Sequence, residues 1–169
     1  MTDDTRRLLP ENLPVVAGHL EEAIGEFQGW GVRIVRASRL PVIVRLLRRT
    51  AERGSYPSDR KELAVLGEAI RDAQEFIEIA NVLPAVPIPS LLNDLQVAVG
   101  GALSAPGPTG PHLRLQTQLW VGAMLTTEEQ GAGVLAHHSD EKNPDYILWN
   151  GTLRYALEVK RPNGALGPQ

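Results

Sequence analysis

The sequence contains no cysteine, and this absence excludes several kinds of chemistry. Without cysteine the chain can form no disulfide framework, no thiol nucleophile and no thiolate zinc site. The sequence also lacks an apolar run of about 18 residues, the length that a membrane-spanning helix needs. Residues 1–7 are polar and charged rather than the apolar core of a signal peptide. We therefore expect neither secretion nor membrane insertion, and we expect a cytosolic location.

The chain has little excess charge of either sign, with a formal net charge of −3 over 169 residues. Such a balance excludes a protein that coats nucleic acid by bulk attraction, but it allows a local basic groove. The apolar content of 43% is that of a globular protein with a buried core, which excludes disorder throughout the chain.

Hydrophobic periodicity predicts helices over residues 14–27, 41–53 and 90–99, ended by glycines. Another helix follows a capping-box pair, Asp59 and Glu62. Its apolar stripe comprises Leu63, Leu66, Ile70, Ala73, Ile77 and Ala80. This stripe requires a partner helix, either from the same domain or from a second copy in a homodimer.

A linker is predicted at residues 104–111, because the segment SAPGPTGP disfavours regular structure. It divides the chain into a helical region, 1–103, and a second unit, 112–169, that opens with a helix at 112–125 and continues with short strands. The predicted fold class is therefore α+β.

A hairpin is predicted at Asn150-Gly151, since both residues tolerate the positive φ angles of a two-residue type I′ turn. This turn would place Leu148 opposite Leu153 and Asp145 opposite Ala156. Side chains alternate between the two faces of a sheet, so Asp145, Glu158 and Lys160 would share the polar face. Asp145 and Glu158 would be diagonal neighbours on adjacent strands, with their backbones roughly 7–8 Å apart across the sheet. Two carboxylates at that separation suit Mg²⁺, which prefers oxygen ligands.

Pro144-Asp145, then a hairpin, then Glu158-Val159-Lys160 resembles the signature of the PD-(D/E)XK (restriction-endonuclease-like) nucleases. The resemblance covers residues 111–162, roughly a third of the chain, and implies a partial α/β core with a helix and a three-stranded antiparallel meander, in which 134–138 is the first strand. It implies that Asp145, Glu158 and the backbone carbonyl of Val159 hold Mg²⁺ or Mn²⁺, while Lys160 orients or activates the attacking water. The expected activity is endonucleolytic hydrolysis of nucleic acid, DNA rather than RNA.

The sequence departs from the family pattern in two places. Many members carry a glutamate on the preceding helix, where this chain offers Gln116 and Gln118; Gln118 matches better, and an amide would lower the metal affinity. The family core also continues with a helix and a fourth strand that this sequence does not contain. The sequence is then either a fragment or a truncated, inactive remnant with an unpaired sheet edge.

Three residues are candidate phosphate contacts of the second unit: Arg114, His138 and Arg161. A zinc cluster of His137, His138 and Asp140 is disfavoured, because adjacent histidines in a strand point to opposite faces. Glu158 and Lys160 could also be a solvated pair worth well under about 1 kcal/mol.

The helical half has a basic run that comprises Arg33, Arg36, Arg39, Arg45, Arg48, Arg49 and Arg53. A nucleic-acid partner would use these residues as phosphate contacts, and the ordinary alternative is a solvated helix face offset by nearby acids. The alternative to a nuclease is accordingly a non-enzymatic module that binds nucleic acid or a protein partner through its helical half.

Overall fold

The computed structural model describes residues 9–82, 89–101, 103, 111–125, 132–137, 146–150 and 153–157. A short 3₁₀ turn, η1 (Pro10–Asn12), leads into α1 (Leu13–Gly29). The helices α2 (Arg39–Arg53), α3 (Arg60–Val82), α4 (Pro89–Gly100) and α5 (Pro111–Leu125) follow in the described part. None of these helices has the length and apolar character needed to span a bilayer.

The helix ends follow local signals in the sequence. Asp59 caps α3, because its Oδ1 accepts hydrogen bonds from the backbone N–H groups of Lys61 and Glu62, each at 2.9 Å. Gly54 ends α2 in the left-handed region, with φ of 65°, which glycine adopts without steric cost. The predicted helices agree with the observed ones to within three residues at each end.

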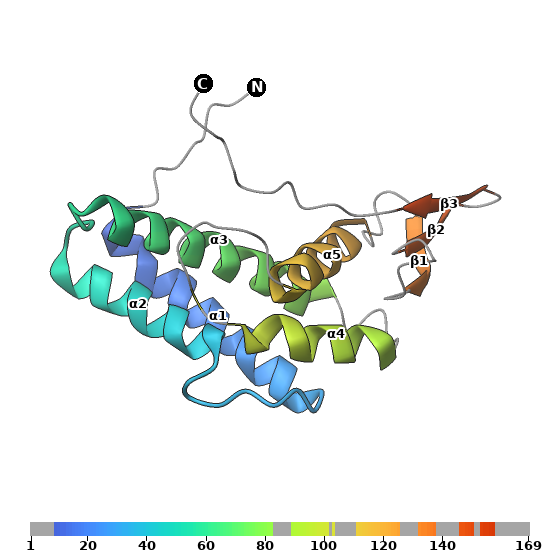
Figure 1. The fold of residues 1–169 in the computed structure, drawn as a ribbon, viewed down its shortest axis with the longest axis horizontal. Coiled ribbons are helices and arrows are strands. Elements are labelled where there is room, and N and C mark those ends of the chain that lie inside the picture. The colour runs from blue at the N-terminus through green and yellow to red at the C-terminus, as the bar shows by residue number, and fades with distance from the viewer. Residues whose placement is uncertain are drawn as a thin grey trace, which may run out of the picture.

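The packed core is all-α, and the predicted α+β class is wrong. Helix α1 packs against α2 and α3, and α5 packs against α3 and α4 (Figure 1). The residues Leu115, Leu119 and Ala123 of α5 belong to the same hydrophobic core as Phe27, Ile43 and Phe76. The helix that the sequence assigned to a separate nuclease core is therefore part of the helical core, because its apolar side completes the side of α3 that α1 and α2 leave uncovered.

The buried side of α3 also differs from the predicted stripe. Leu63 is 46% exposed, and Ile70 and Ile77 are only half-buried. The buried residues of α3 are Leu66, Ala69, Asp72, Ala73, Glu75, Phe76, Ile79 and Ala80. This side is wider than a single stripe, since α3 contacts helices on more than one side, and it includes two acids.

Beyond α5 the structure describes three short strands as backbone, β1 (Ala132–His137), β2 (Tyr146–Asn150) and β3 (Leu153–Leu157). They pair antiparallel in the order β1-β2-β3 and lie beyond the end of the helical core in Figure 1. A register irregularity separates Val134 from Ala136 in the first pair.

The predicted hairpin register is wrong by two residues. Leu148 pairs with Tyr155 and Ile147 with Ala156, so Asn150 is itself paired, with Leu153. Only Gly151 and Thr152 lie between these two in the sequence. A two-residue loop with glycine first is also a common hairpin connection, so the Asn-Gly dipeptide alone does not distinguish the two registers.

Candidate functional site

The residues of the predicted metal site lie outside the described residues. This holds for Asp145, Glu158, Val159 and Lys160, and for the candidate phosphate contacts His138 and Arg161. The described strand residues next to them show which strand ends come together. His137, the last residue of β1, pairs with Tyr146, and Tyr146 pairs with Leu157, the last residue of β3.

These three strand ends adjoin the candidate residues in sequence. His138 follows His137, Asp145 precedes Tyr146, and Glu158 follows Leu157. The corrected register pairs Tyr146 with Leu157 directly, whereas the predicted register paired it with Tyr155.

The candidates on α5 fall on different sides of the helix. Arg114 is exposed, as a phosphate contact requires. Gln118, the expected substitute for the family's glutamate, is buried at 6% exposure within the helical core. Gln116, the weaker match, is fully buried and belongs to a polar cluster.

This buried polar cluster comprises Arg39 at the start of α2, Asp72 and Glu75 on α3, and Gln116 on α5. The Arg39 guanidinium lies 2.6 Å from Asp72 Oδ2, and its Nη1 donates to the carbonyl of Ala98 on α4 at 3.3 Å. It also donates to the side-chain oxygen of Gln116. The cluster thereby joins four of the five helices described.

The amide of Gln116 bridges the other members of the buried polar cluster. Its Nε2 donates to Asp72 Oδ1 at 3.0 Å and also to Glu75 Oε2. Arg39 further lies over the ring of Phe76, with 5.6 Å from Cζ to the ring centroid. Each of these hydrogen bonds joins two different helices, so the cluster fixes how the helices pack.

Sequence reasoning missed this cluster, although a signal was present. Arg39 was grouped with the basic run of phosphate contacts, and that part of the interpretation is wrong because its side chain is 1% exposed. Asp72 and Glu75 are three residues apart, and each directly precedes a buried apolar residue, Ala73 and Phe76, so they share the apolar side of α3. Acids within an apolar face indicate a buried cation, and Arg39 is that cation.

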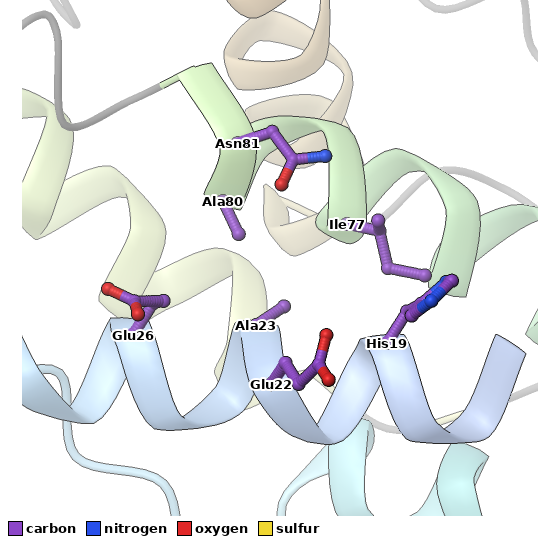
Figure 2. Close-up of a pocket in the computed structure, with 7 residues that line it drawn as sticks. All are labelled: His19, Glu22, Ala23, Glu26, Ile77, Ala80 and Asn81. Atoms are coloured by element: carbon purple, nitrogen blue, oxygen red, sulfur yellow. The ribbon is translucent and has the colours of Figure 1, made fainter. Parts of the chain in front are cut away.

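A groove of about 360 Å³ lies on the surface between α1 and α3. Figure 2 shows His19, Glu22 and Glu26 extending from α1, with Asn81 of α3 across the groove. Ala23 and Ala80 form its floor. In the described part of the chain, His, Asp and Glu side chains do not gather in groups of three that could hold a metal.

The remaining basic residues of the run are exposed. Arg45, Arg48, Arg49 and Arg53 project from α2, and Arg33 and Arg36 lie on the loop before it. Arg48 forms an ion pair with Glu21 of α1 at 2.6 Å, and both side chains are exposed to solvent. Arg45 Nη1 donates to the backbone carbonyl of Arg36 at 3.0 Å.

Comparison with known proteins adds no family assignment. No protein-family model matches the chain, and neither the curated proteins nor the solved structures searched give a match. Any function assigned to this chain rests on its own residues.

Proposed function

We propose that the chain hydrolyses phosphodiester bonds in nucleic acid, with DNA as the preferred substrate, and that Asp145, Glu158 and Lys160 carry the reaction. The observation that supports this proposal is the pairing of Tyr146 with Leu157 in β2 and β3. Asp145 and Glu158 are the sequence neighbours of this pair on the side away from the hairpin loop. The proposal requires these two acids, each next to a paired strand end in sequence, to share one cation.

The donor set is suited to a hard divalent cation. Asp145 and Glu158 contribute carboxylate oxygens, and Val159 contributes a backbone carbonyl oxygen, so all three protein ligands are oxygen atoms. Mg²⁺ prefers such ligands and retains several waters, and Mn²⁺ accepts the same set. When bound, the cation would neutralise the charge that builds up on the phosphate oxygens.

The chain's own residues have separate roles in this proposal. Asp145 and Glu158 hold the cation, and Lys160 orients the attacking water by donating a hydrogen bond or helps it to lose its proton. Arg161 follows Lys160 in the sequence, and its guanidinium suits a phosphate oxygen of the substrate. Because Gln118 is buried in the helical core, its contribution would be to position the helix rather than to ligate the cation.

A second candidate function is binding without cleavage. It is favoured by the helical core, which completes its own packing through the buried polar cluster and exposes arginines on α2. In this case the helical half would bind nucleic acid, and the strands would have no catalytic role.

The experiment is a cleavage assay with the full chain on duplex DNA, single-stranded DNA and RNA, with Mg²⁺, with Mn²⁺ and with EDTA. We expect cleavage only with a divalent cation, and loss of at least about a hundredfold in rate in Asp145→Asn and Lys160→Ala. Lys61→Ala, an exposed lysine on α3, is the matched control and should cleave normally. Cleavage by Asp145→Asn at the normal rate would refute the assignment, and wild-type protein that binds but never cleaves would establish the second candidate.

A further inference from the structure

Helix α2 carries four exposed arginines along its solvent-facing side, with Glu52 the one acid of the helix among them. We define the arginine face as Arg45, Arg48, Arg49 and Arg53 together with Arg33 and Arg36 on the preceding loop. Arg45, Arg49 and Arg53 are four residues apart, so they form one row with a rise of about 6 Å between successive members. The opposite side of α2 is buried through Leu40, Ile43, Val44 and Leu47.

The loop part of the arginine face is held in place by hydrogen bonds. Gln96 of α4 accepts from the backbone N–H of Arg33 at 2.7 Å and donates to its carbonyl at 3.2 Å. Ser38 Oγ accepts from the backbone N–H of Val35 at 3.0 Å. The bond from Arg45 to the carbonyl of Arg36 ties the loop to the helix. These contacts fix the backbone of Arg33 and Arg36 and leave both side chains exposed, which lowers the entropy lost on binding.

The arginine face has more positive charge than its neighbours compensate. Arg48 pairs with Glu21, and Glu52 lies about one helical turn from both Arg48 and Arg49. No carboxylate of the described residues forms an ion pair with Arg49 or Arg53. Arginines spaced four residues apart on a helix repel one another, and an anionic partner removes this repulsion. The positive charge is local, since the chain as a whole has a net charge of −3.

We propose that the arginine face binds the phosphate backbone of nucleic acid. A row of guanidinium groups along a helix matches a linear polyanion, and each planar guanidinium can donate two hydrogen bonds to one phosphate. A membrane surface fits less well, because the apolar side of α2 is buried in the core and is not available for insertion among lipids. This inference rests on the proposed function in one respect, because both name nucleic acid as the binding partner.

The test is a binding measurement by fluorescence anisotropy with a labelled DNA duplex and a labelled single strand of the same sequence. EDTA is present throughout, so that binding is measured without cleavage. The variant is Arg49→Gln with Arg53→Gln, and the matched control is Arg60→Gln with Lys61→Gln, which removes two exposed cations from the start of α3. Circular dichroism spectra of both variants confirm that the helices have formed.

We expect the α2 variant to bind at least about tenfold more weakly and to reduce the slope of log Kd against log salt by about two. The control should bind like the wild type. Equal weakening in both variants, or no binding by the wild type, would overturn the proposal. The proposal would also be overturned if the wild type self-associated in a salt-dependent way, or bound anionic vesicles in place of DNA, and Arg49→Gln with Arg53→Gln abolished that behaviour. Asp145→Asn should bind normally, so loss of cleavage and loss of binding remain separate results.

Discussion

The guanidinium of Arg39 and the carboxylate of Asp72 form an ion pair with both side chains buried, at 2.6 Å between Nη2 and Oδ2. The pair joins the first turn of α2 to the middle of α3. A charge left alone in this position would have no water to solvate it, so each partner makes the burial of the other tolerable. Gln116 extends the same network to α5.

Removal of one partner should be more damaging than removal of both. Asp72→Ala leaves the Arg39 guanidinium buried without its counter-ion and should lower the free energy of unfolding by about 3–5 kcal/mol. The double variant Arg39→Met with Asp72→Leu replaces the pair by apolar groups and should recover part of that loss, since Gln116 then lacks its hydrogen bonds to Arg39 and Asp72. Urea unfolding followed by circular dichroism measures both.

Arg48→Ala is the control for this comparison, because it removes an ion pair with Glu21 that is exposed to solvent. Its cost should stay below about 1 kcal/mol. If Asp72→Ala were no more destabilising than Arg48→Ala, the buried ion pair would have no special part in the stability of the fold.

The amide of Gln116 should determine how firmly α5 is docked. Gln116→Leu removes an acceptor from Arg39 and a donor from Asp72 and Glu75, at about 1–3 kcal/mol for each buried group left unsatisfied. We expect faster amide hydrogen exchange along α5 than in the wild type. Gln74→Leu makes the same chemical change at an exposed position of α3 and should leave exchange unchanged. Unchanged protection of α5 in Gln116→Leu would show that apolar contacts alone hold this helix.

Two glycines should respond oppositely to the same substitution. Gly54 has φ of +65° and no atom within 4 Å of an added Cβ, so Gly54→Ala should cost about 1 kcal/mol from backbone strain alone. Gly67 lies exposed in the interior of α3, also with open space around an added Cβ. Gly67→Ala should therefore stabilise the protein by about 0.5–1 kcal/mol. Thermal unfolding gives the sign of each change, and a stabilising Gly54→Ala would contradict the left-handed helix end.

The candidate site could be predicted only as a set of residues. The acids and the lysine near the hairpin were identified from their types and spacing, and their role stays a prediction. The register of the hairpin was wrong by two residues, because Asn150-Gly151 and Gly151-Thr152 both satisfy the demands of a short turn. Local turn chemistry does not distinguish these registers without the pairing of the strands themselves.

The sequence by itself determined where the helices begin and end. Asp59 and Gly54 act on backbone groups within a few residues of themselves, so the signal and its effect are both local. Only the tertiary structure decided which sides of the helices are buried. Helix α3 receives α1 and α2 on one side and α5 on another, which buries Asp72 and Glu75 and draws Arg39 out of the basic surface and into the core. A residue's partner across helices depends on chain segments far away in sequence, and periodicity within one helix carries no information about them.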